Sequence, residues 1–229
     1  MSVDDTVRVA GVDRYPKGWV SIVLRAGRFD TALVAQRLKS LVGQLSDVVV
    51  IGLDIPIGLP ERGPREADRL ARAFVGPRRA SVFLTPPRAV LEAPDITVAR
   101  ARSRTLSGGS ISTQAWALHE TILEADPIAQ HDPRVREVHP EVSFAALAGR
   151  PLAEPKSSWA GVVHRRQLLM TAGIIIPDEL GPAGVAGVAD ILDAAVAAWS
   201  ACRVAAGVEE SLPHEPQVGA DGRGAAIWY

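Results

Sequence analysis

The sequence predicts an α/β protein with one mixed β-sheet flanked by helices, and three observations indicate this fold. Residues 6–13 and 18–25, near the N-terminus, are apolar runs with the composition of strands. Residues 33–45 then carry apolar side chains at helical spacing. Residues 48–56 (VVVIGLDIP) follow as the clearest strand in the chain, and Pro56 ends it.

The first two strands are expected to form an antiparallel hairpin. Residues 13–18 (DRYPKG) join them, and Pro16 and Gly18 are typical turn residues. Residues 6–13 are apolar at successive positions, as in a strand covered on both faces. A short third strand is predicted over residues 28–34, which completes the antiparallel start of the sheet.

We interpret residues 58–110 as a helical and irregular insertion after the fourth strand, within a single domain of residues 1–229. Residues 65–76 have a helical pattern, and residues 76–95 are rich in proline. The remaining elements are predicted in chain order: a helix over 112–125 capped by Ser112, a strand-like run over 135–144 broken by Pro140, a helix over 165–174, the longest helix over 190–206, and an edge strand over 225–229.

The composition is that of an ordinary globular protein, with 47% hydrophobic and 22% charged residues. The formal net charge of −1 does not indicate a nucleic-acid partner. The N-terminal MSVDDTVRV lacks the features of a signal peptide, and no apolar run approaches the ~20 residues that cross a bilayer. We therefore expect a cytoplasmic protein without a membrane partner. The single cysteine, Cys202, is interpreted as a buried structural thiol.

Four aspartates lie at positions where an apolar chain has little reason to place them. Asp13 ends the run VRVAGVD, and Asp54 ends VVVIGLD. Asp190 and Asp193 lie one helical turn apart at the start of the last helix. A carboxylate at the tip of a buried strand is costly unless a positive charge neutralises it. Converging carboxylates suit Mg²⁺ or Mn²⁺, so the four predict an acidic metal site.

Each aspartate also has a purely structural interpretation. Asp13 would cap the turn that follows it, and Asp190 would be the N-cap of its helix. Asp54 fits this explanation poorly, because the Ile-Pro after it blocks helix capping. The joint occurrence of the four at strand ends and at a helix N-terminus favours the functional interpretation.

A fifth acid, Glu141, occurs in the sequence EVHPE. Strand alternation would place Glu137, His139 and Glu141 on one side. Metal ligation, general base catalysis and proton relay all remain open for this group. For His139 alone, the spacing favours a core histidine with satisfied hydrogen bonds.

Basic residues are concentrated in the insertion. They could form a face that binds phosphates or a helix surface exposed to solvent, and charge alone does not decide between these. Lys156 and Arg165 are further candidates to hold a phosphate, although surface solvation is the ordinary role of each. The candidate phosphate ligands are Lys156, Arg165, Arg72 and Arg79, and the other arginines of the two clusters are Arg62, Arg65, Arg69, Arg78, Arg88, Arg100, Arg102 and Arg104.

Several motifs together resemble one family. GVDRYPKGW, DIPIGLP, READRLAR, RRASVFLTPPR, STQAWAL, EVHPEVSF and ADILDAAVAAWSA are similar to the family called domain of unknown function 429, predicted RNase H-like nucleases. The resemblance covers about Val7 to Tyr229 and implies an RNase H-like sheet. It also implies an acidic cluster from the first strand, the fourth strand and the last helix, as in Holliday-junction resolvases. The matching residues are Asp13, Asp54, Asp190 and Asp193, with Glu141 as an addition.

The chain departs from the common pattern of this family in two places. Residues 14–17 (RYPK) replace part of the usual GVDGCRGGW opening, which affects the loop and not Asp13. Ala189 stands where many relatives carry a further acid.

The first functional hypothesis is hydrolysis of nucleic-acid phosphodiester bonds at a two-metal site, with Asp13 bridging two Mg²⁺ or Mn²⁺ ions. The type of nucleic acid and the oligomeric state, a homodimer included, remain open. One alternative is a Mg-nucleotide-binding phosphotransferase of actin-like type, although the expected glycine-rich loop is missing. The other is a catalytically inactive module that binds nucleic acid or protein.

Overall fold

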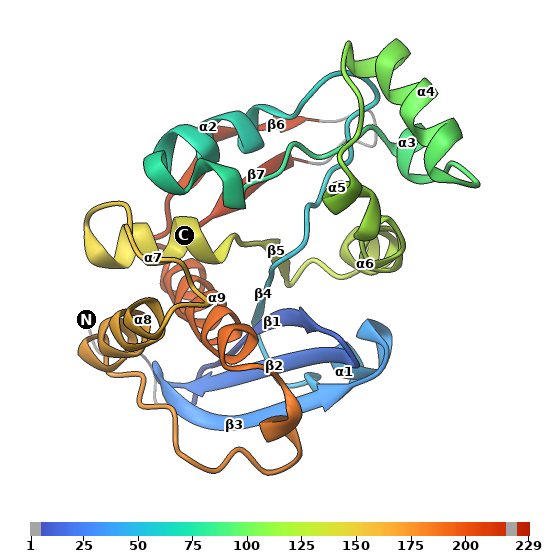
Figure 1. Ribbon diagram of the computed structural model, residues 1–229. Coiled ribbons are helices and arrows are strands. Elements are labelled where there is room, and N and C mark those ends of the chain that lie inside the picture. Colours follow the sequence, from blue (N-terminus) through green and yellow to red (C-terminus); the bar gives the residue numbers. More distant parts are fainter. Residues whose placement is uncertain (1–5, 219–223) are drawn as a thin grey trace.

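A computed structural model describes residues 6–218 and 224–229 and contains a five-stranded mixed sheet in the order β3-β2-β1-β4-β5 (Figure 1). β1 pairs antiparallel with β2, and β2 with β3, whereas β4 runs parallel to both β1 and β5. The mixed sheet predicted from the sequence is thus confirmed. Its strands are β1 (Arg8–Tyr15), β2 (Gly18–Arg25), β3 (Arg28–Ala35), β4 (Val50–Leu53) and β5 (Val135–Glu137).

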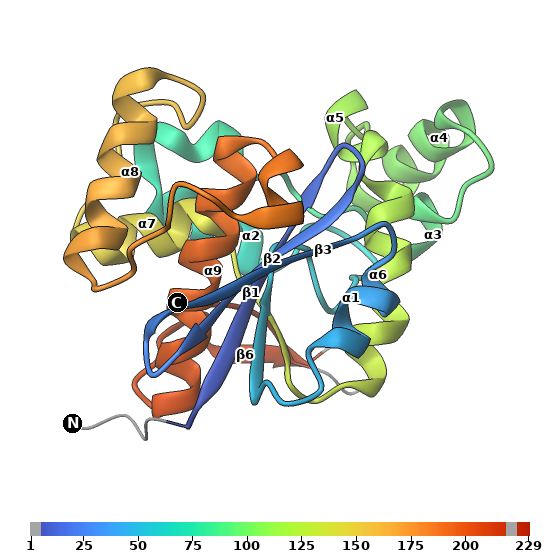
Figure 2. The same ribbon diagram turned by 90° about the horizontal axis from the view of Figure 1, so that it is seen from below.

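Helices cover both faces of this sheet. α9 (Val188–Ala206) lies on one face together with α8 (Trp159–Thr171), and α1 (Leu38–Gln44) and α6 (His119–His131) lie on the other (Figure 2). Side chains of β1 therefore point to opposite faces of the sheet in turn. Val9 packs in the core on the α9 side, whereas Ala10 and Val12 pack on the α1 side. A strand covered on both faces is the reason that residues 6–13 are apolar at successive positions.

Three helix predictions need correction. The helix expected over residues 165–174 is α8, which begins at Trp159 and ends at Thr171. The helix expected over residues 33–45 begins only at Leu38, because Leu33 and Val34 continue β3 and pair with β2. The single helix expected over residues 112–125 is two helices, α5 (Thr113–Ala117) and α6. The Ser112 hydroxyl caps α5 as predicted, because its oxygen accepts a hydrogen bond from the Ala115 N–H at 3.0 Å.

The segment between β4 and β5 contains the helices that were expected in the insertion. The helix predicted over residues 65–76 is confirmed as α2, and the proline-rich stretch after it forms short helical turns and loops. These elements lie beyond the end of the large sheet in Figure 1. They are α2 (Glu66–Phe74), the 3₁₀ helix η1 (Gly76–Ser81), α3 (Arg88–Leu91) and α4 (Ile96–Ser107).

The strand predicted over residues 135–144 is wrong in its second half. β5 stops at Glu137, and Pro140 begins α7 (Pro140–Ala148). Proline fits the first position of a helix, since the N–H it lacks would have no partner there. Glu141 therefore belongs to a helix, and the alternation that would align it with Glu137 and His139 does not exist.

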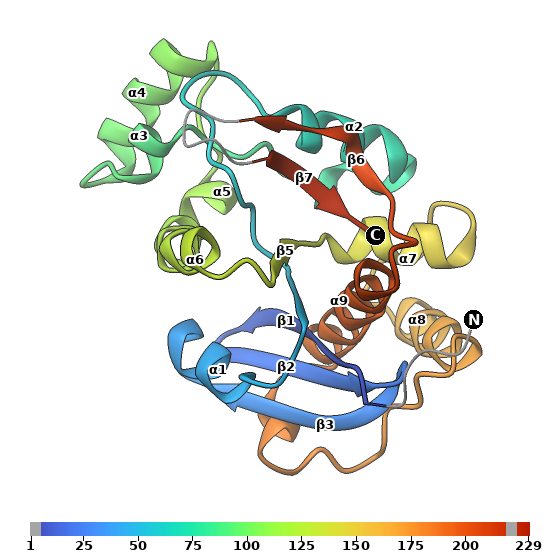
Figure 3. The ribbon, with the colours of Figure 1, turned by 180° about the vertical axis from the view of Figure 1, so that it is seen from behind.

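The last strand of the chain does not extend the large sheet. β7 (Gly224–Trp228) pairs antiparallel with β6 (Ser211–Val218) in a separate two-stranded sheet. Figure 3 shows this hairpin beside α2, and Ile227 packs in one core cluster with Ala67 and Ala71 of that helix. The C-terminal hairpin and the insertion therefore form one layer. The short 3₁₀ helix η2 (Gly181–Val185) precedes α9.

Cys202 lies half-buried in α9, where burial raises the pKa of its thiol to about 11. The group stays protonated at neutral pH, in keeping with the structural role expected for it. Within residues 6–218 and 224–229, no helix combines the length and apolarity needed to span a membrane.

Candidate metal centre

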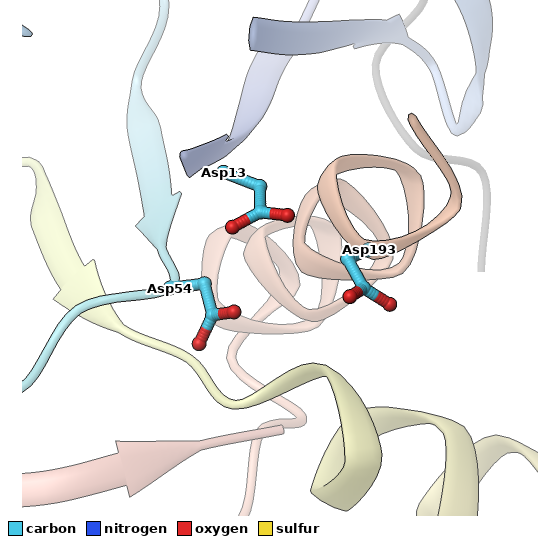
Figure 4. Close-up of side chains that lie close together, drawn as sticks. All are labelled: Asp13, Asp54 and Asp193. Atoms are coloured by element: carbon cyan, nitrogen blue, oxygen red, sulfur yellow. The ribbon is translucent and has the colours of Figure 1, made fainter. Parts of the chain in front are cut away.

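Three aspartates from distant parts of the chain meet at one end of the sheet. Asp13 comes from β1, Asp54 directly follows β4, and Asp193 lies on α9. One carboxylate oxygen of each lies within 4.8 Å of the others, and Figure 4 shows the three side chains converging. Asp13 is 6% exposed and Asp193 is 2% exposed, whereas Asp54 is half-buried, so solvent reaches the cluster mainly at Asp54.

Close backbone packing of α9 against two strands brings the cluster together. Gly11 of β1 lies opposite Gly52 of β4 in the parallel register. A Cβ atom at Gly11 would overlap the carbonyl oxygen of Ala194, and one at Gly52 would lie 2.6 Å from that of Ala197. Only glycine at both positions allows the helix to lie this close. Each glycine precedes its aspartate by two positions, so glycine and aspartate face the helix from the same side of the sheet.

Burial and mutual repulsion work against ionisation of the cluster. Burial raises the pKa of Asp13 well above its usual range, and the charges of Asp54 and Asp193 add to the effect. For the same reasons, burial first and then the Asp193 charge, the pKa of Asp54 rises to about 8. Burial also raises the pKa of Asp193, although the Lys156 charge opposes this. Three such carboxylates ionise together only when a cation joins them.

Lys156 supplies one positive charge to the cluster. Its Nζ donates a hydrogen bond to Asp193 Oδ2 at 2.6 Å, and about half of its side chain is exposed. Burial alone would lower the pKa of Lys156, but the neighbouring carboxylates raise it, and the side chain stays an ammonium ion. The backbone N–H of Arg14 donates to Asp13 Oδ1 at 2.6 Å. These contacts neutralise one of the three negative charges.

Asp190 is not part of the group that the structure brings together. It lies half-buried in the first turn of α9, with its carboxylate against the backbone of Gly187, the N-cap residue. Burial raises its pKa, while Lys156 and a hydrogen bond from Gly187 oppose the shift. Asp190 is thus a capping residue at the third helical position and not the N-cap itself.

Glu141 and Arg165 form a buried ion pair beside the cluster. Arg165 Nη2 donates to Glu141 Oε1 at 2.8 Å, and Arg165 Nη1 donates to the carbonyl oxygens of Glu154 and Gly161. Arg165 is 1% exposed. It therefore ties α8 to the loop that carries Lys156, and the phosphate role of Arg165 stays a prediction.

The aspartates line a cavity of about 280 Å³ between the sheet and the insertion. Two arginines of the insertion, Arg65 and Arg78, line it, and the Arg78 guanidinium lies 3.7 Å from Glu141. Arg79 is exposed outside this cavity, and Arg72 lines a separate one. Other residues of the lining are Lys156, Glu141, His139, Phe83, Gln114 and Ile227.

A buried network of charged residues, which the sequence did not predict, fixes the insertion to the sheet. Arg65 pairs with Glu137 of β5 through two hydrogen bonds of 2.7 Å each, and it also donates to Asp68. Asp68 in turn accepts from the Thr85 N–H at 2.6 Å, and Glu137 accepts from the Ile57 N–H at 2.6 Å. The spacing of Arg65 and Asp68 is visible in the sequence, but nothing there indicates a partner 72 residues away.

His139 lines the cavity with one of its ring nitrogens hydrogen-bonded, to the backbone of Ser81. Its Nδ1 is buried and has no hydrogen-bond partner among the residues that the structure describes. Burial and the Lys156 charge lower the pKa of His139 to about 4. The cavity therefore holds a neutral imidazole beside the acidic cluster at physiological pH.

Fold and site together define an α/β protein with a buried acidic cluster whose oxygen ligands are of the kind that bind a divalent cation. Residues 11–218 match the family model described as "Protein of unknown function (DUF429)", and the chain belongs to this family. No curated protein and no solved structure matches the chain.

Proposed function

We propose that this protein is a metal-dependent nuclease that hydrolyses nucleic-acid phosphodiester bonds on an RNase H-like fold. The observation that carries the proposal is the convergence of Asp13, Asp54 and Asp193, from the first strand, the fourth strand and the last helix. The resemblance of the sequence motifs to predicted RNase H-like nucleases supports the same assignment.

The three aspartates fit Mg²⁺ or Mn²⁺, because all of their donors are oxygens and their repulsion needs a cation. Such an ion supplies an activated water and stabilises charge on a phosphate. The chain's own residues do the rest in this proposal. Lys156 and Arg78 hold the non-bridging phosphate oxygens, and the Glu141–Arg165 pair keeps the Lys156 loop in place.

The charges of the cluster favour one tightly bound ion in the free protein. Three carboxylates and the Lys156 ammonium leave two negative charges, which one divalent cation neutralises. A second ion would give the buried site a net positive charge until a substrate phosphate arrives. We therefore propose that the second ion of the two-metal scheme enters together with the substrate.

The test is metal binding and cleavage in Asp13→Asn and Asp193→Asn. Each loses a ligand, and we expect cleavage to fall by roughly 100-fold or more, as the loss of about 3 kcal/mol of metal stabilisation predicts. Calorimetry should show one Mn²⁺ per wild-type chain and none in either variant. Asp190→Asn is the matched control on the same helix, with cleavage expected within about threefold of wild type.

The outcomes separate this proposal from its rivals. Full cleavage by Asp13→Asn, or in excess EDTA, contradicts the metal-dependent mechanism. Metal binding and tight ATP binding without cleavage would support the actin-like phosphotransferase instead. Nucleic-acid or protein binding without any metal binding would support the inactive module.

A further inference from the structure

A second cavity, of about 460 Å³, lies beside the acidic one within the insertion. Val82, Phe83 and Gln114 line both cavities, so the two are neighbours that share part of their lining. The volume falls within the range of about 300–1,000 Å³ that is usual for small-ligand sites. A molecule bound in both cavities would place one group at the aspartates and its next group on the other side of Phe83.

The burial of the aspartates limits the width of the substrate. Asp13 and Asp193 are 6% and 2% exposed, and Asp54 is half-buried. Ile227 of β7 and Phe83 of the insertion line the same cavity. A duplex carries its phosphates on the outside of a wide, stiff cylinder, which cannot enter such a space. A single strand is narrow and flexible, and its bases are free to turn into side pockets.

The lining of the second cavity has the groups that recognise a nucleotide. Phe83 and Ile111 provide apolar surface, and an aromatic ring is a stacking partner for any base. Arg72 lines the same cavity, and only one of its N–H groups has a partner in the described part of the chain, the Val82 carbonyl oxygen at 3.3 Å. Its remaining donors suit a phosphate.

Two hydroxyl groups of the lining also lack hydrogen bonds. Thr85, only 1% exposed, and Ser107 each have a side-chain oxygen without a partner among the described residues. Native proteins rarely leave such groups unsatisfied, and where they do, bound water or a ligand commonly completes them.

We propose that the second cavity binds the nucleotide unit next to the scissile phosphate, and that the substrate is therefore single-stranded nucleic acid. The proposal rests on the nuclease function proposed above. It assigns Phe83 to base stacking, Arg72 to the neighbouring phosphate, and the Asp13 cavity to the scissile phosphate.

The test measures binding and chemistry separately on the whole chain of residues 1–229. Fluorescence anisotropy in the Asp13→Asn background compares a labelled single-stranded oligonucleotide, its duplex and a free mononucleotide. Arg72→Ala removes the phosphate contact, and Ser110→Trp fills the cavity from an exposed position in its lining. Arg104→Ala and Thr105→Trp, both exposed on α4 and outside both linings, are the matched controls for charge and bulk.

We expect the single strand to bind at least about tenfold more tightly than the duplex or the mononucleotide, and Arg72→Ala and Ser110→Trp to weaken it roughly tenfold. The controls should stay within about twofold. Equal or tighter binding of duplex or mononucleotide, or unchanged single-strand binding in both cavity variants, would overturn the proposal.

Hydrolysis of bis(p-nitrophenyl) phosphate with Mn²⁺, in the otherwise wild-type protein, distinguishes the two proposals. This small diester needs only the acidic cavity, so Ser110→Trp and the two control variants should hydrolyse it at the wild-type rate. If the protein hydrolyses the small diester and both cavity variants bind the single strand as tightly as wild type, the subsite is overturned and the nuclease function stands. If the protein does not hydrolyse the diester but Arg72→Ala weakens single-strand binding, the nuclease function is overturned and the subsite is supported.

Discussion

The two sides of the acidic cavity are held in place by different forces. On the sheet side, the cluster of Asp13, Asp54 and Asp193 depends on backbone packing, where α9 lies against Gly11 and Gly52. On the insertion side, α2 is fixed by the buried charges of Arg65 and its partners.

This difference shows that the two sides of the cavity depend on different kinds of interaction. Packed backbone fixes distances, which a metal site requires. A buried ion pair adds little net stability, yet losing one partner is costly because the other charge is left alone. The sheet side is thus specified by many small contacts, and the insertion side by a few charged residues.

Among the variants that test this comparison, Arg65→Ala is expected to lower the free energy of unfolding most. It leaves Asp68 and Glu137 buried without their counter-charge, so the free energy of unfolding should fall by about 3–5 kcal/mol. Below the unfolding transition, Mn²⁺ binding should persist, because the three aspartates lie on the other side. Urea unfolding and calorimetry measure the two effects.

Arg69→Ala on the same helix is the control for Arg65→Ala. Arg69 is exposed, and its removal should change stability by no more than about 0.5 kcal/mol. A loss below about 1 kcal/mol for Arg65→Ala would show that the charge network does not hold the insertion.

A smaller effect is expected from Gly11→Ala. The added methyl group pushes α9 from the strands, so we expect a loss of about 1–3 kcal/mol together with weaker Mn²⁺ binding. Gly43→Ala, where the methyl group meets nothing within 4 Å in α1, should instead stabilise the protein by up to about 1 kcal/mol. Equal thermal stability of both variants would contradict the close-packing argument.

The smallest effect is the pH dependence of the metal-free protein. The folded chain keeps the Asp54 proton up to pH of about 8, whereas the unfolded chain loses it near its ordinary pKa. Since the folded state binds more protons, stability should fall by about 1–2 kcal/mol from pH 6.5 to 8. His139, with its pKa lowered to about 4, is neutral in the folded chain over this range, and its partial protonation near pH 6.5 in the unfolded chain offsets only about 0.4 kcal/mol of the decline.

Two measurements check this expectation. Thermal unfolding in EDTA should show the decline, and Asp54→Asn should reduce it. Saturating Mn²⁺ should reverse the slope, because the metal binds the deprotonated carboxylates. A metal-free stability that rises with pH over this range would be inconsistent with a raised pKa at Asp54.

The sheet side was predictable because its signals are local. The apolar runs before Asp13 and Asp54 identify strand ends, and the alanine-rich run identifies a buried helix. Spacing did not separate Asp193 from Asp190, since that distinction depends on how the first turn of α9 contacts Gly187. The glycine two positions before each strand aspartate is the signal that marks the face toward the helix.

The insertion side was not predictable because its partners are distant in the chain. Arg65 was interpreted as part of a basic surface, yet it is buried against Glu137. Glu141 was placed on a strand, although Pro140 before it is a usual first residue of a helix. The strand β6 was likewise not predicted, because it contains two prolines. Proline has no N–H to donate to the hydrogen-bond ladder and occurs mainly in edge strands.

The glycine pair has a consequence for ion selectivity. Because Gly11 and Gly52 set the separation of α9 from the strands, they also set the size of the space that the three carboxylates enclose. Mg²⁺ takes oxygen ligands at about 2.1 Å, and Ca²⁺ takes them at about 2.3–2.6 Å. If the cluster binds an ion as proposed, two residues without side chains thus contribute to which ionic radius it accepts.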